Sequence, residues 1–278
     1  MKVLEAIGLS KVYNPRHSWL GRSGREPGLT AIDGVSLSIA PGENAALIGE
    51  SGSGKSTLAR LLLGLEKPTF GRVRYRGIDY TDLRMKDMRG IRSKLQMVFQ
   101  NSYAAFNPMF TVAQIIDEPL RNYDCDSVEM RTQRIREVLE QVGLAASTAH
   151  KYPHELSGGQ LQRVGIGRAL ALRPELIVCD EPFSSLDVTI RKQMVTLLQE
   201  LKDQLGLSYL FISHDLSLVQ RFCDSVTVLQ RGRIAERYSS VHLLKHSSHP
   251  YTRQLLAAVP IQHPAQRKTP LQVQSNHY

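Results

Sequence analysis

A glycine-rich segment, GESGSGKST, follows an apolar run that ends at Ile48 and precedes an apolar helix that Gly64 closes. Gly49 to Ser56 has the pattern G-x-x-x-x-G-K-S, which sets small residues, a lysine and a hydroxyl at fixed spacing. Glycines allow backbone N–H groups to turn towards an anion, and the positive end of the following helix favours negative charge there. The segment is therefore predicted to bind the phosphates of a nucleotide.

Within this segment two side chains have distinct chemistry. Lys55 is expected to reach the β- and γ-phosphates, and Ser56 is expected to bind the Mg²⁺ that accompanies ATP. The full set predicted to hold the nucleotide here is Gly49, Ser51, Gly52, Ser53, Gly54, Lys55, Ser56 and Thr57.

Two neighbouring carboxylates follow a second apolar run, LIVC, at Asp180 and Glu181. This position is the carboxyl end of a buried strand, where open α/β sheets bind their ligands. Asp180 is suited to hold Mg²⁺, and Glu181 is placed to orient or deprotonate an attacking water. The pair supplies what hydrolysis of a nucleotide requires beyond binding.

The segment LSGGQ, residues 156–160, has a different pattern. Ser157 and Gln160 have capping-box spacing ahead of an amphipathic helix, and Gly158 and Gly159 remove side chains where a ligand could approach closely. The segment therefore predicts a second helix N-terminus suited to anions, about 100 residues from the first.

The order of elements around these residues predicts an α/β fold. Residues 1–50 have mostly strand patterns, and residues 175–240 contain short apolar strands that helical stretches separate. Residues 111–172 have a helical pattern, with a capping-box start at Asp126 and Glu129. We expect a parallel α/β core that a helical segment interrupts.

Length, cysteine content and hydropathy limit the class of protein. A chain of 278 residues suits a large domain with a smaller lobe. Cys125, Cys179 and Cys223 are far apart, which argues against a disulfide framework or a zinc site and favours a reducing cytosol. There is no apolar stretch suited to a signal peptide, and none reaches the roughly 18 apolar residues of a membrane span. We therefore expect the chain itself to be soluble.

Taken together, these motifs resemble those of the ATP-binding subunit of an ABC (ATP-binding cassette) transporter. LSGGQ is the signature of that family, and the glycine-rich loop and the Asp180-Glu181 pair match its Walker A and Walker B motifs. The resemblance covers nearly all of the chain. It implies a head-to-tail dimer in which each ATP lies between the glycine-rich loop of one subunit and the signature helix of the other.

The resemblance also implies roles for further positions. Tyr13 matches the aromatic residue that stacks on adenine, and Gln100 matches the glutamine that contacts Mg²⁺ and links the site to the membrane subunits. Asp187 belongs to the D-loop SSLD, in which Ser185 replaces the commoner alanine. His214 matches the switch histidine that contacts the γ-phosphate.

The fold that this family implies is α/β: a P-loop NTPase (RecA-like) core with an antiparallel β subdomain and a helical signature subdomain. We expect residues 1–240 to form the ABC ATPase domain, with the helical subdomain at about 101–172. Residues 241–278 are expected to form a C-terminal helical extension and tail.

Several segments resemble the peptide and nickel importer branch of the family, among them NSYAAFNP, YPHELSGGQ and HPYT. We therefore predict an ATP hydrolase that drives uptake of a dipeptide, an oligopeptide or a nickel chelate from the cytoplasmic face of the inner membrane. The implied partners are a second ATPase subunit, identical or paralogous, two transmembrane permease subunits and an extracytoplasmic solute-binding protein. The resemblance leaves open both the solute and the choice between homodimer and heterodimer.

Two other classes of function compete with this prediction. A soluble ABC ATPase of DNA repair or translation would use basic surface on nucleic acid, but the chain has neither heptads nor a repeated phosphate-binding loop. A nucleotide sensor without turnover is disfavoured by Glu181 and His214. His242 and His246, spaced i,i+4 near the C-terminus, could suggest a metal site, but a polar tail is the favoured interpretation.

The chain is basic, with 35 Lys and Arg against 26 Asp and Glu and a net charge of +9. Nucleic acid, an anionic membrane and a phosphate-rich ligand all attract such a charge. In RVRYRG, residues 72–77, the arginines share one strand face, which is either a nucleic-acid stripe or, as we favour, the solvated face of an antiparallel sheet. Most basic residues lie outside the motifs, so we expect a solvated surface near an anionic inner leaflet and no nucleic-acid partner.

Overall fold

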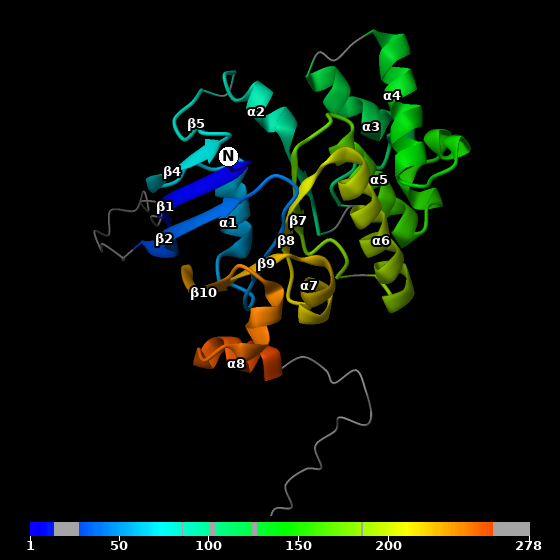
Figure 1. Ribbon diagram of the computed structural model, residues 1–278. Helices are drawn as coiled ribbons and strands as arrows, with labels where there is room; N and C mark the ends of the chain where they lie inside the picture. Colours follow the sequence, from blue (N-terminus) through cyan, green and yellow to red (C-terminus); the bar gives the residue numbers. More distant parts are fainter. Residues whose placement is uncertain (14–27, 85, 101–103, 124–126, 185, 258–278) are drawn as a thin grey trace, which may run out of the picture.

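The protein is built on two β-sheets with helices packed around them (Figure 1). The computed structural model describes residues 1–13, 28–84, 86–100, 104–123, 127–184 and 186–257. The strands are β1 Leu4–Tyr13, β2 Leu29–Ile39, β3 Asn44–Ile48, β4 Phe70–Tyr75, β5 Ile78–Asp79, β6 Leu95–Val98, β7 Leu176–Asp180, β8 Ser208–Ile212, β9 Ser225–Gln230 and β10 Arg233–Tyr238. The α-helices are α1 Lys55–Leu62, α2 Arg89–Lys94, α3 Val112–Asn122, α4 Val128–Gln141, α5 Gly158–Leu170, α6 Val188–Leu205, α7 Leu216–Phe222 and α8 Pro250–Ala257.

The larger sheet has the strand order β10-β9-β3-β8-β7-β6. Its strands β6, β7, β8, β3 and β9 pair in parallel, so their carboxyl ends meet at one edge. β10 pairs antiparallel with β9, so the expected parallel core has one antiparallel edge strand. Arg231 and Gly232 between them both have positive φ, as a two-residue hairpin turn requires, so no helical crossover separates these strands.

The two faces of this sheet belong to two separate apolar cores. Ile177 and Cys179 of β7 point into a core that also contains residues of α3 to α7, whereas Leu176 and Val178 point into a core with α1 and the smaller sheet. This alternation follows from the period of two in a strand. As a result α1 and α5 lie on opposite sides of the sheet (Figure 1).

The smaller sheet is antiparallel, with the order β2-β1-β4-β5, and it covers α1. Val73 and Tyr75 of β4 are buried, while Arg72 and Arg76 are exposed and pair with Asp79 and Glu175. Arg74, the third arginine of this face, is half-buried, so the structure agrees with the favoured interpretation of a solvated face of an antiparallel sheet at Arg72 and Arg76. The structure therefore contains the antiparallel β part that we expect beside the α/β core.

Helices α3, α4 and α5 pack together beside the larger sheet (Figure 1). The predicted start of α4 was one residue early, because Ser127 is its N-cap and Asp126 lies outside the described residues. Ser and Asp are equally good N-caps, so residue type alone did not separate them. Within the part of the chain that the structure describes, no helix is long and apolar enough to span a lipid bilayer.

The C-terminal part continues from β10 through a 3-10 helix, Val241–His246, to α8. His242 and His246 are both exposed, and a 3-10 helix has three residues a turn, so i,i+4 side chains do not align on it. The described residues contain no cluster of three or more His, Cys, Asp or Glu able to hold a metal ion. His263, His277 and the rest of the tail lie outside these residues.

Candidate functional site

The loop between β3 and α1 has two glycines, Gly49 and Gly54, at positions with no room for a side chain. A Cβ on Gly54 would meet the Ala31 carbonyl oxygen at 2.6 Å, and a Cβ on Gly49 would collide with the Leu229 carbonyl. Gly49 and Gly54 also have φ values of 154° and 105°, which side chains rarely adopt. Glycine at these positions lets the loop lie against β2 and β9, with Gly54 as the N-cap of α1.

Lys55 is folded back onto this loop. Its Nζ donates hydrogen bonds to the carbonyl oxygens of Gly49, at 2.8 Å, and Glu50, at 2.7 Å. Burial lowers the pKa of Lys55, and the carboxylates of Glu181, Asp180 and Glu50 oppose that effect. The ammonium is thus a buried positive charge with carboxylates nearby, suited to exchange a carbonyl partner for a phosphate oxygen.

Asp180 ends β7 beside the start of α1. Burial raises the pKa of its carboxyl, while a hydrogen bond from the Ser56 side chain lowers it, and the charge of Glu181 adds to the rise. The ionised carboxylate therefore has an unfavourable environment that a cation would relieve. The oxygen donors of Ser56 and Asp180 are the ligand types that Mg²⁺ prefers, so these residues fit the metal that the family implies.

Glu181, the next residue, lies between two other predicted site residues. Its Oε1 is 3.2 Å from Nδ1 of His214, and its Oε2 accepts a hydrogen bond of 3.1 Å from Nε2 of Gln100. Its φ is +45°, a left-handed conformation that is unfavourable for a residue with a Cβ. The carboxylate is therefore held by contacts with two segments at the carboxyl edge of the sheet.

Tyr13, at the end of β1, lies beside α1. Its hydroxyl donates to Glu66 at 2.5 Å and also hydrogen-bonds the side chain of Thr57 in the first turn of α1. Burial and the Glu66 contact raise the pKa of this phenol. The Nζ of Lys11 is 5.2 Å from the ring centroid, so one face of the ring already has a cation. The structure thus places the predicted adenine-stacking residue next to the phosphate-binding loop.

The LSGGQ segment has the predicted capping box. The Ser157 hydroxyl accepts from the Gln160 amide at 3.3 Å, and the Gln160 side chain accepts from the Ser157 amide at 3.0 Å. A Cβ on Gly159 would meet Cγ2 of Ile190 at 3.0 Å, so packing against α6 is one reason for glycine there. Because α5 and α1 lie on opposite sides of the sheet, the structure does not bring this segment to the glycine-rich loop of its own chain.

Two residues at the site edge were missed from the sequence. Arg191 donates to Asp215 at 2.7 Å and to the Leu186 carbonyl at 3.1 Å, and it thereby joins the D-loop to the residue after His214. Asp187 accepts from the Ile190 amide at 2.9 Å as the N-cap of α6, while Ser185 lies outside the described residues. Asp215 had one local signal, since it is an N-cap residue type directly before α7; Arg191 had none.

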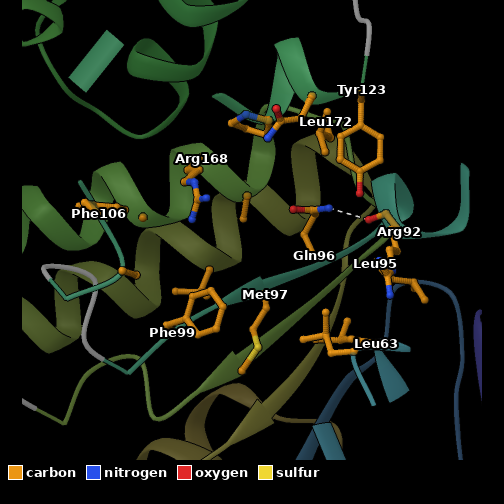
Figure 2. Close-up of a pocket in the computed structure, with 17 residues that line it drawn as sticks. Leu63, Arg92, Leu95, Gln96, Met97, Phe99, Phe106, Tyr123, Arg168 and Leu172 are labelled. Carbon is orange, nitrogen blue, oxygen red and sulfur yellow. Dashed lines mark hydrogen bonds between the residues drawn. The ribbon is translucent and has the colours of Figure 1, made fainter. Parts of the chain in front are cut away.

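A separate groove of about 250 Å³ lies between β6, α3 and α5 (Figure 2). Its walls are mostly apolar, with Leu95, Phe106 and Leu172 among them, and Arg92, Tyr123 and Arg168 contribute polar groups. At one end the groove reaches Phe99, which is 42% exposed and directly precedes Gln100 in the chain. The groove is therefore continuous with the chain segment that contacts Glu181.

A glycine-rich loop between a strand and a helix, beside carboxylates that end a parallel strand, defines a nucleotide-binding ATPase of the P-loop class. The chain matches the ABC transporter family model over residues 32–184. It is 45% identical over 232 residues to the oligopeptide transport ATP-binding protein AppF of Bacillus subtilis, covering 83% of this chain and 70% of that protein. It is 42% identical over 266 residues to the probable peptide ABC transporter ATP-binding protein y4tS of Sinorhizobium fredii, covering 96% and 75%.

The fold is also similar to that of a solved ABC structure. The dimeric post-hydrolysis state of the ATP-binding cassette MJ0796, bound to ADP and Pi, superposes with a TM-score of 0.73 at 30% identity, covering 84% of this chain and 97% of that one. The present chain therefore belongs to the ABC transporter family, as an ATP-binding and ATP-hydrolysing member.

Proposed function

We propose that this chain is the ATPase subunit of an importer for dipeptides or oligopeptides, located at the cytoplasmic face of the inner membrane. The observation that carries the proposal is the similarity, over most of the chain, to ATP-binding proteins named for peptide and oligopeptide transport. Nickel, which the sequence left open, has no comparable support. The C-terminal HPYT segment agrees with either solute.

The proposed hydrolytic centre is formed by Glu181, His214 and Gln100. Glu181 accepts a proton from the attacking water, because its carboxylate is held at the end of β7 and remains free to form one further hydrogen bond. His214 is 64% exposed and turns from Glu181 to the γ-phosphate when ATP is bound. Gln100 orients the carboxylate and contributes to the metal site.

Binding of ATP is assigned to the loop of residues 49–57. The backbone amides of this loop and the first turn of α1 cradle the phosphates, and the same loop carries the Ser53 hydroxyl, which is buried with no hydrogen-bond partner among the described residues. Ser56, Asp180 and Gln100 would hold Mg²⁺, which when bound neutralises phosphate charge. Tyr13 supports the adenine ring beside Thr57.

The active unit is proposed to be a head-to-tail dimer with an identical or paralogous ATPase subunit. Within one chain, Gly159 packs on Ile190 of α6 and Gly158 lies near Leu186, and α5 is on the other side of the sheet from α1. Their glycine-rich helix start is therefore free to contact the nucleotide of a second cassette, together with Gln160 and the D-loop residue Asp187. The dimeric state of the related cassette MJ0796 agrees with this arrangement.

The groove between β6, α3 and α5 is the proposed docking surface for one permease subunit (Figure 2). Movement of a segment seated there is transmitted along Phe99 to Gln100 and so to Glu181. Replacing Phe99 with Glu should abolish co-purification with the permease while ATP binding is retained. The matched control is Phe70→Glu, since Phe70 is 68% exposed on β4, away from the groove.

Transport assays test the function as a whole. The chain is assembled in lipid vesicles with its partner ATPase, two permease subunits and the solute-binding protein, and uptake of labelled dipeptide, pentapeptide and Ni²⁺ is measured. We expect ATP-dependent uptake of peptide alone. Uptake of Ni²⁺ without peptide, or ATP hydrolysis that nucleic acid stimulates in the absence of membrane subunits, would overturn the proposal.

A further inference from the structure

The C-terminal helix α8 contacts the phosphate-binding loop through one side chain. Tyr251, which is only 5% exposed, accepts a hydrogen bond of 2.8 Å from the backbone N–H of Glu50. We propose that Tyr251 is a positioning residue that sets the affinity for ATP by holding the Gly49–Glu50 peptide group in one orientation. It belongs to the HPYT segment, which the ATPase site itself does not otherwise use.

The contact reaches Lys55 through a single peptide group. The N–H of Glu50 and the C=O of Gly49 belong to the same planar unit, so fixing one fixes the other. Tyr251 holds the N–H side, and the Nζ of Lys55 donates to the Gly49 carbonyl at 2.8 Å. The resulting chain of Tyr251, peptide group and Lys55 is polarised in one direction, which strengthens each hydrogen bond in it.

This peptide group needs an external restraint. Gly49 has a φ of 154° and carries no side chain, so its backbone can rotate where another residue could not. Rotation would turn the carbonyl away from Lys55 and would leave the Glu50 N–H without its partner. Tyr251 opposes that rotation, and burial raises the pKa of its phenol, which keeps the hydroxyl neutral.

Tyr251 is itself held at the start of α8. The His249 Nδ1 accepts from the Tyr251 amide at 3.3 Å, and the Ser247 hydroxyl accepts from the His249 amide at 3.1 Å. The same Ser247 hydroxyl donates to Glu236 of β10 at 2.6 Å. In HPYT, the His249 side chain therefore caps α8, Pro250 is the first residue of α8, and Tyr251 connects α8 to the phosphate-binding loop.

The test is Tyr251→Phe in the full chain, with Tyr209→Phe as the matched control, because the buried Tyr209 hydroxyl on β8 donates to the Leu198 carbonyl of α6 and not to the phosphate-binding loop. The first variant keeps the buried ring and removes only the hydroxyl. We expect its KM and Kd for MgATP to rise about three- to tenfold with kcat within about twofold of the wild type, because a buried donor loses its partner. Tyr209→Phe should leave both constants unchanged. An unchanged KM in Tyr251→Phe, or an equal rise in the control, overturns the proposal.

A second measurement detects the hydrogen bond between the Glu50 N–H and Tyr251 without relying on enzyme activity. Amide hydrogen exchange in the apo chain should show faster exchange at Glu50 in Tyr251→Phe, with core strands such as β7 unchanged. Unchanged exchange at Glu50 overturns the proposal, and faster exchange supports it. The inference rests on the proposed role of Lys55 in binding ATP, and Lys55→Ala tests that role separately. If this variant still binds ATP, the role of Lys55 is refuted. The exchange result at Glu50 does not depend on that outcome.

Discussion

The Nδ1 of His214 lies 3.2 Å from Oε1 of Glu181, at the carboxyl edge of the parallel sheet. Gln100 donates to the other carboxylate oxygen, so Glu181 is held from two strands at once. Its left-handed backbone adds a local cost that the surrounding sheet compensates. These two contacts fix the orientation of the carboxylate, and under the proposed function Glu181 is the base that accepts a proton from water.

Replacing Glu181 with Gln should stop turnover and leave ATP binding in place. The amide keeps the size of the carboxylate and one acceptor oxygen but does not accept the proton of a water, so kcat should fall about 10²- to 10⁴-fold. Phosphate release gives the rate, and size-exclusion chromatography with MgATP gives the dimer. Glu200→Gln, on the exposed face of α6, is the control. A turnover within about tenfold of the wild type would refute the assigned base.

Short windows of sequence were sufficient to predict the local structure around the candidate site. The loop at 49–56, the strand end at 176–181 and the capped helix at 157–160 each combine a periodic pattern with side chains of definite chemistry. Such windows are local, so their structure depends little on the rest of the chain. The fold class followed from these windows, since alternating strands and helices can pack into only a few stable layer architectures.

The contacts between distant windows were not predictable in this way. Tyr251 is 201 residues from Glu50, and Arg191 is 24 residues from Asp215. Which side chain reaches which loop depends on how α8 and α6 pack, and no pattern within either helix specifies a partner across the sheet. The two-residue connection at Arg231 and Gly232 is, by contrast, a local hairpin signal for the antiparallel direction of β10, and the expected parallel core did not use it.

Asp180→Asn should stabilise the chain without nucleotide and abolish its stabilisation by MgATP. Burial raises the pKa of Asp180, so its ionised form costs the folded state free energy at neutral pH. That cost is absent below the unfolded pKa of about 4 and is complete above the raised folded value. At pH 7 the variant should melt about 2 to 4 °C higher, and the difference should shrink as the pH falls towards 4.

Differential scanning fluorimetry with and without MgATP checks both parts of this prediction. Asp203→Asn, an exposed residue on α6, is the control and should follow the wild type at every pH. If the variant melts lower than the wild type at pH 7, the ionised Asp180 carboxylate does not destabilise the fold. If MgATP stabilises the variant as much as the wild type, Asp180 is not a ligand of the metal.

Arg191→Met should lower kcat about tenfold and leave the Kd for ATP within about twofold. Its guanidinium joins the Leu186 carbonyl to Asp215, so its loss frees the D-loop from the segment that carries His214. The ion pair is partly exposed and contributes little to stability, which limits the change in melting temperature. Single-turnover hydrolysis separates the two constants. Arg191→Lys should recover part of kcat, since an ammonium replaces one of the two contacts; a lost ATP affinity would instead indicate a folding role.

Gly159→Ala distinguishes packing within the chain from approach of a nucleotide. The added Cβ meets Cγ2 of Ile190 at 3.0 Å, so the single variant should lose about 1 kcal/mol of stability and also ATP-dependent dimerisation. Adding Ile190→Ala gives the methyl group space and should restore much of the melting temperature. If Gly159 lies against the nucleotide of a second subunit, the double variant still fails to dimerise with ATP in chromatography, whereas Ile190→Ala alone dimerises. Recovery of dimerisation in the double variant would mean that glycine is needed there only for the contact with α6.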